Sequence, residues 1–127
     1  MAKRSIDLTP EDIRAYRNAL FTRLQRVCPE IEERRSRAWA LARRAAGILR
    51  ERFGVKRVVV FGSLIHKGCF TLWSDVDLAV WGLHPEDTFK AMGLLQDLDE
   101  NIEVNLIDIR SCTPSLRAVI ESEGVEV

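Results

Sequence analysis

The sequence predicts a small α/β domain that is preceded by a long helical N-terminal segment. In the first half of the chain, apolar residues recur at steps of three and four, which indicates helices. After Gly54 the pattern changes to short β-branched or alternating runs, which indicate strands. Helical stretches alternate with these strands. We therefore expect the element order αα-β-β-α-β-α in one domain, as is usual for a chain of 127 residues.

Two helices are expected in the N-terminal segment. Residues 9–12 read TPED, which provides an N-cap threonine, a proline for the first helical position and a capping-box acid. Pro29 interrupts the first apolar pattern, and proline removes a backbone donor, so the first helix should end there. A second helix should run from about residue 30 to Phe53, and Gly54 is well placed to end it.

Three strands and two helices are expected after Gly54. Residues 57–61 read RVVVF, a short buried strand, and residues 75–81 alternate between two faces. Residues 102–109 form the third strand. A helix should open at Pro85, between the second and third strands, and another should run from residue 113 to about Glu123.

The charges are balanced in total but not locally. The chain carries 19 Lys+Arg and 19 Asp+Glu, yet residues 1–57 hold 15 basic and 7 acidic side chains, whereas residues 58–127 hold 4 and 12. The arginines of the expected second helix are either a solvated face or a contact surface for an acidic partner or for phosphate groups.

Several classes of protein are excluded by composition. No apolar run approaches the roughly 20 residues needed to span a bilayer, and no signal peptide is evident at the N-terminus. The three cysteines are too far apart for a zinc site, and their odd number argues against a disulfide framework. We expect a cytoplasmic protein without a membrane partner.

Chemistry is indicated by Gly62-Ser63 at the end of one strand and by Asp75 and Asp77 on the next. Residues at positions i and i+2 of a strand project from the same face, so the two carboxylates can share one ligand. Oxygen ligands of this kind suit Mg²⁺, which uses one or two carboxylates together with substrate phosphates. The Gly-Ser pair offers backbone N–H groups and a hydroxyl to a phosphate. A nucleotide with Mg²⁺ is therefore the expected ligand.

These motifs in this order resemble the minimal nucleotidyltransferases of the DNA polymerase β-like superfamily. More narrowly, they are similar to the MNT half of HEPN/MNT toxin–antitoxin pairs. The resemblance rests on residues 58–63 (VVVFGS), 73–82 (WSDVDLAVWG) and 104–108 (VNLID). It implies a nucleotidyltransferase-type mixed sheet with helices over residues 38–127, with residues 1–37 as a helical extension.

The resemblance also implies roles for individual residues. Gly62 and Ser63 would hold the nucleotide phosphates, and Asp75 and Asp77 would bind the metal. ATP and Mg²⁺ would serve to transfer AMP to a hydroxyl, typically a tyrosine, of a partner HEPN RNase toxin, which the chain would neutralise as an antitoxin. A third catalytic carboxylate is usual on the next strand, and at that position this sequence has Asn105.

Asn105 puts the chemistry in question, because an amide cannot act as a general base and brings no charge to a cation. Glu103 shares the predicted strand face with Asn105 and could substitute for the missing carboxylate. Otherwise the enzyme works with two carboxylates or is impaired. An impaired chain would neutralise the toxin by binding alone. Nucleic-acid binding through the arginine-rich helix is the least favoured alternative.

Residues around these motifs are expected to be structural or idle. Trp73 and Trp81 flank the strand that carries the aspartates, and aromatic residues at strand ends mostly pack. His66 and Lys67 follow the Gly-Ser pair and are expected to be solvated loop residues, although each could reach a phosphate.

Overall fold

The chain folds into a four-stranded sheet with helices on both faces. The computed structural model describes residues 9–66 and 68–127, without the side chains of residues 21–28. Lys67 and the first eight residues of the expected N-terminal extension lie outside this description. The helices are α1 (Pro10–Phe53), α2 (Thr88–Gln96) and α3 (Pro114–Glu123), and the strands are β1 (Arg57–Phe61), β2 (Val76–Trp81), β3 (Val104–Asp108) and β4 (Val125–Glu126).

The sheet is mixed and has the order β3-β2-β1-β4. Strands β2 and β3 are parallel, whereas β1 pairs antiparallel with both β2 and β4. The expected α/β class and mixed sheet are confirmed. Strand β4 was not predicted, because its two residues follow α3 directly and are too few to show a period.

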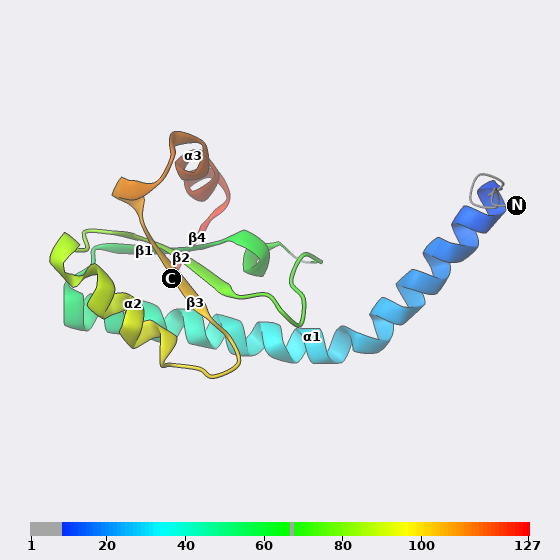
Figure 1. The fold of residues 1–127 in the computed structure, drawn as a ribbon, viewed down its shortest axis with the longest axis horizontal. Helices are drawn as coiled ribbons and strands as arrows, with labels where there is room; N and C mark the ends of the chain where they lie inside the picture. Colours follow the sequence, from blue (N-terminus) through cyan, green and yellow to red (C-terminus); the bar gives the residue numbers. More distant parts are fainter. Residues whose placement is uncertain (1–8, 67) are drawn as a thin grey trace, which may run out of the picture.

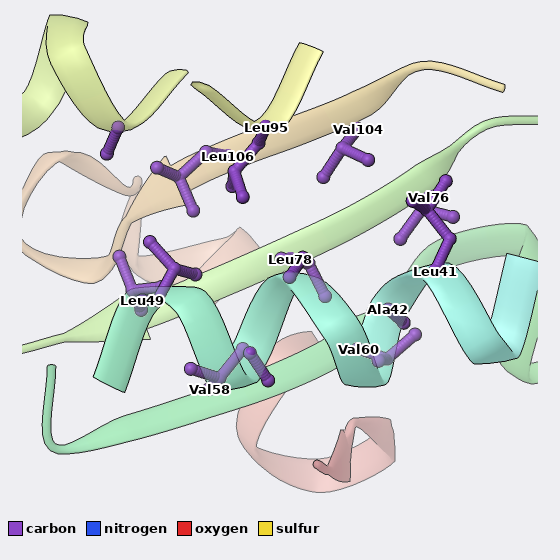
Figure 2. Close-up of a cluster of buried hydrophobic side chains, with 14 of the residues drawn as sticks. Leu41, Ala42, Leu49, Val58, Val60, Val76, Leu78, Leu95, Val104 and Leu106 are labelled. Carbon is purple, nitrogen blue, oxygen red and sulfur yellow. The ribbon is translucent and has the colours of Figure 1, made fainter. Parts of the chain in front are cut away.

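Helices α1 and α2 cover one face of the sheet and α3 covers the other (Figure 1). Strand alternation separates the two cores: Val58 and Val60 point toward α1, while Val59 packs with the α3 side. Figure 2 shows α1 crossing the strands with its small and apolar side chains against them. The core against α1 includes Ala38, Leu41, Ala42, Ala45, Leu49, Val76, Leu78, Val80, Leu95, Val104 and Leu106.

Helix α1 is continuous, so the prediction of two helices separated at Pro29 was wrong. The expected ends are confirmed: Thr9 forms a capping box with Asp12, and Gly54 adopts a left-handed conformation with φ of 65°. Pro29 lies inside the helix and is exposed. A proline costs one backbone hydrogen bond and bends a helix, but the helix continues when the turns on both sides are stable. Figure 1 shows the helix changing direction before it meets the sheet.

Other elements differ from expectation only at their ends. The stretch opened by Pro85 begins as a 3₁₀ turn, Pro85–Asp87, and becomes α-helical at Thr88. The expected helix after Thr113 is confirmed as α3. Within the described ranges, no helix combines the length and the apolar character needed to cross a bilayer.

Candidate functional site

The end of β1 approaches the predicted metal-binding strand very closely. Phe61, the last residue of β1, pairs with Asp77 of β2, and Gly62 follows in the 3₁₀ turn Gly62–Ile65. Gly62 has φ of 81°, and a Cβ atom built on it would lie 2.5 Å from Oδ2 of Asp77. Only glycine combines this backbone conformation with the space that the carboxylate requires. The turn carrying Ser63 therefore lies next to the Asp77 carboxylate.

Asp77 and Asn105 are neighbours across the parallel strands β2 and β3. The Nδ2 amide of Asn105 donates a hydrogen bond of 3.1 Å to Oδ1 of Asp77. Asp75 lies directly before β2, and both aspartates are half-buried. The sequence-predicted residues Gly62, Ser63, Asp75, Asp77 and Asn105 thus gather at one end of the sheet.

The electrostatics of this cluster favour a bound cation. Burial raises the pKa of Asp77, the hydrogen bond from Asn105 lowers it in part, and the negative charge of Asp75 raises it again. A cation held between the two carboxylates would offset both the desolvation and the repulsion. Two carboxylates fit Mg²⁺, which completes its coordination with phosphate oxygens and water.

Among the described residues, no third carboxylate is placed to share a metal ion with Asp75 and Asp77. Asn105 presents its amide donor, not its oxygen, to Asp77. Glu103 lies just before β3, and its carbonyl accepts a 2.9 Å bond from the backbone N–H of Val76. Across the described part of the chain, no three His, Cys, Asp or Glu side chains are placed to hold one metal ion together. Asp108, three residues beyond Asn105 on β3, pairs with Arg110.

An open groove of about 620 Å³ lies beside Asp75. Its lining combines cations and carboxylates with one aromatic ring: Arg34, Arg37, Leu72, Trp73, Asp75, Glu100, Asn101 and Glu103. Trp73 is 83% exposed, so the expectation that it packs was wrong. Trp81 does pack, with the Arg57 guanidinium 4.4 Å from its ring centre.

The arginines of α1 support the loops of the site, a role that sequence reasoning missed. Nη2 of Arg34 donates 3.0 Å bonds to the carbonyls of Ser74 and Asn101, which precede β2 and β3. Nη2 of Arg35 donates a 3.1 Å bond to the carbonyl of Leu64 in the turn after Gly62. Two adjacent arginines thus hold the three loops that carry the site residues. No motif in the sequence indicates this role, because the carbonyls that the two arginines bind are distant along the chain.

The loop after Ser63 has a second attachment. Nε2 of His66 lies 3.2 Å from Oε2 of Glu123 at the end of α3. His66 is exposed, as expected for a loop residue, and Lys67 lies outside the described residues.

The fold is similar to chains of solved toxin–antitoxin complexes. A chain of the complex MntA–HepT has 20% identity and a TM-score of 0.52, over 69% of each chain. A mutant of that complex gives 19% and 0.55, over 67% of this chain and 70% of that one. A toxin–antitoxin structure with AMP-PNP gives 24% and 0.54, over 64% and 67%. No curated protein matches this sequence.

The family is shown by a sequence-family model. The model described as "Polymerase beta, Nucleotidyltransferase" matches residues 44–127, which include the turn at Gly62, strands β2 and β3, and helix α3. The resemblance to the DNA polymerase β-like nucleotidyltransferases is therefore confirmed. The chain belongs to the polymerase β nucleotidyltransferase family.

Proposed function

We propose that this chain is an antitoxin that transfers AMP from ATP, with Mg²⁺, to a tyrosine hydroxyl of a HEPN-type RNase toxin. The observation that carries the proposal is the pairing of Phe61 with Asp77 and of Asp77 with Asn105. In this register the turn Gly62–Ile65, the carboxylates of Asp75 and Asp77 and the amide of Asn105 lie at one end of the sheet, which supports binding of phosphate and metal there. Such a set suits in-line displacement at phosphorus.

The expected roles follow from position. The backbone N–H groups and the hydroxyl at Gly62 and Ser63 bind the triphosphate, and Asp75 and Asp77 hold Mg²⁺. When bound, the metal neutralises the phosphates and orients them. The acceptor oxygen forms a bond to the α-phosphorus, the bond to the β-phosphate bridge breaks, and pyrophosphate leaves. The hydroxyl proton passes to water.

A tyrosine acceptor, which the resemblance to HEPN/MNT pairs implies, suits a site without a carboxylate at position 105. Asn105 is no base, so the acceptor hydroxyl must lose its proton without a carboxylate at that position. A phenol with a pKa of about 10 does this far more readily than an aliphatic alcohol. Tyrosine is therefore the favoured acceptor.

The direction of attack follows from the order of strands. The turn proposed to bind the triphosphate lies on the β1 side of Asp77, so an acceptor on the β3 side would be separated from it by the carboxylates. The groove beside Asp75 lies on that side and presents exposed Trp73 as a platform for an aromatic ring. A toxin partner and ATP are further supported by the similar structures, which are toxin–antitoxin complexes, one of them with AMP-PNP.

The test is transfer of label from [α-³²P]ATP to the protein encoded by the neighbouring reading frame, with Mg²⁺ present. We expect label on the partner with the wild-type chain and none with Asp75→Ala/Asp77→Ala. If the wild-type chain labels nothing while Asn105→Asp does so under the same conditions, this chain is not an active transferase.

A second candidate is an antitoxin that works by binding alone, and the amide of Asn105 in place of a carboxylate favours it. Toxin neutralisation in cells separates the two functions. Asp75→Ala/Asp77→Ala abolishes neutralisation if AMP transfer is required and leaves it intact if contact is sufficient.

A further inference from the structure

The two carboxylate oxygens of Asp77 face different elements of the site. Oδ2 faces the turn after β1, because a Cβ atom built on Gly62 would lie 2.5 Å from it. Oδ1 faces β3 and accepts the 3.1 Å hydrogen bond from Nδ2 of Asn105. Strand β2 lies between β1 and β3 in the sheet, so the strand order accounts for this division. Asp77 thus presents one oxygen to the turn and the other to the amide.

The orientation of the Asn105 amide is determined by its neighbour. An ionised carboxylate only accepts hydrogen bonds, so the amide presents its N–H group, and not its oxygen, to Asp77. The N–H group carries the positive end of the amide dipole, which opposes a cation that approaches Oδ1 from the side of β3. Asp77 is half-buried, and a buried carboxylate is costly without a partner, so the bond is worth keeping. The β3 side of Asp77 is therefore unfavourable for a cation.

Ligands for a second ion are also missing on that side. Sites with two metal ions hold them about 3.5–4 Å apart, so negative ligands are needed to offset the repulsion between the ions. Asp75 and Asp77 supply two negative charges, and Asn105 supplies none. Glu103 is exposed, and its recorded contact with β2 is made by its backbone carbonyl. Within residues 9–66 and 68–127, no third His, Cys, Asp or Glu is placed to share an ion with the pair. The negative charge of the site matches one divalent ion.

We propose that Asn105 limits this site to a single divalent ion, held by Asp75 and by Oδ2 of Asp77 on the side of the Gly62 turn. This rests on the proposed function, in which nucleotide phosphates complete the coordination of that ion. Asn105 is then a specificity-determining residue, because it keeps a second ion away from the acceptor hydroxyl. An acceptor without a metal ion beside it has to lose its proton unaided, which favours phenols over aliphatic alcohols.

The experiment counts Mn²⁺ ions, which take the place of Mg²⁺ and are detected by electron paramagnetic resonance. The full chain is mixed with an equimolar amount of AMP-PNP and titrated with Mn²⁺. We expect the wild-type complex to bind one ion, with the spectrum of isolated Mn²⁺. Asn105→Asp should bind two, with the spin coupling expected of two ions about 4 Å apart.

The matched control is Asn101→Asp. It adds the same carboxylate to the groove beside Asp75, at a residue that does not pair with Asp77. We expect this variant to bind one ion, as the wild-type chain does, and Glu103→Gln to bind one as well. The wild-type count tests the proposal by itself, so the result does not depend on how well Asn105→Asp folds without metal.

The outcomes separate this proposal from the proposed function. Two ions in the wild-type complex overturn the single-ion site and leave the proposed function standing. The single-ion site is also overturned if folded Asn105→Asp binds one ion, or if Asn101→Asp gains a second ion as Asn105→Asp does.

Calorimetry tests the proposed function separately, through the affinity for AMP-PNP with Mn²⁺. Asp75→Ala/Asp77→Ala should weaken binding at least about tenfold, because both carboxylates hold the ion. If the wild-type chain binds no Mn²⁺ with AMP-PNP, or if the double variant binds as tightly, the proposed function fails and the single-ion site fails with it.

Discussion

Asn105 and Asp77 share a hydrogen bond at the centre of the candidate site. The amide of Asn105 stabilises the Asp77 carboxylate against its own burial and against Asp75. A carboxylate at the same position would instead add repulsion and need a cation to offset it. The neutral donor at position 105 therefore lowers the cost of burying Asp77 beside Asp75.

Replacing Asn105 with aspartate would put a carboxylate where the neutral amide donor lies. Asn105→Asp should lower the free energy of unfolding without metal by about 1–3 kcal/mol, because it removes a hydrogen bond and places a third carboxylate in the cluster. Millimolar Mg²⁺ should restore stability to the variant by binding the folded state. Urea denaturation with and without Mg²⁺ measures both effects. A variant as stable as wild type without metal would contradict this description of the site.

Gly62 is expected to tolerate no side chain. Gly62→Ala should cost about 1–3 kcal/mol of stability and weaken nucleotide binding, because the residue has a positive φ and its Cβ would meet Oδ2 of Asp77. Gly93→Ala is the matched control: it lies in α2 with open space around it and should stabilise by up to about 1 kcal/mol. Thermal melting and ATP titration of both variants test this. Equal effects at the two glycines would show that the close approach to Asp77 is unimportant.

Asp108 should contribute a pH-dependent part of stability. Hydrogen bonds from the Arg110 side chain hold the pKa of Asp108 below its usual range. A lowered folded-state pKa means that its contribution is present above about pH 4 and is lost as the pH falls through the folded value. Asp108→Asn should therefore lower stability by about 1 kcal/mol at pH 7.

The measurement is denaturant unfolding of both proteins from pH 7 to pH 3. The difference between them should shrink below pH 4. A difference that stays constant to pH 3 would mean that ionisation of Asp108 is not involved.

At the scale of helices and strands, the sequence predicted the features that depend on residues close together in the chain. The capping box at Thr9, the end of α1 at Gly54 and the alternation in β2 all depend on neighbours in the chain, and all are confirmed. Continuity through Pro29 could not be predicted, since it depends on the turns on both sides outweighing one missing bond. The attachment of the site loops to Arg34 and Arg35 depends on residues 29 to 67 positions away.

Arg34 should act on the site through the loops that it joins. Arg34→Ala removes two bonds from a charged donor and should cost about 2–3 kcal/mol, and Arg34→Lys should recover only part, because an ammonium lacks the planar fork. Arg44→Ala, on an exposed turn of the same helix, should change stability by less than about 0.5 kcal/mol. Urea denaturation gives the stabilities, and ATP titration reports on the site. Equal costs at both arginines would contradict a specific role for Arg34.

Across the whole molecule, the separation of charge acquires a structural meaning. The basic helix lies along the sheet and uses several arginines on acidic or carbonyl groups of the second half, as in Arg37–Asp99 and the bond from Arg50 to the carbonyl of Val127. Residues 13–29 carry four arginines and no acidic residue, and they are flanked by Glu11, Asp12 and Glu30. The motifs alone predicted which residues gather at the site. They could not predict the groove beside Asp75, because α1 and the loops before β2 and β3 form it together.

The most direct test of covalent neutralisation is the intact mass of the partner protein after co-expression with this chain. We predict a partner heavier by one or more AMP units on a tyrosine when the wild-type chain is present, and an unmodified, active toxin when Asp75→Ala/Asp77→Ala replaces it. A partner that is neutralised by the wild-type chain yet keeps its unmodified mass would contradict AMP transfer.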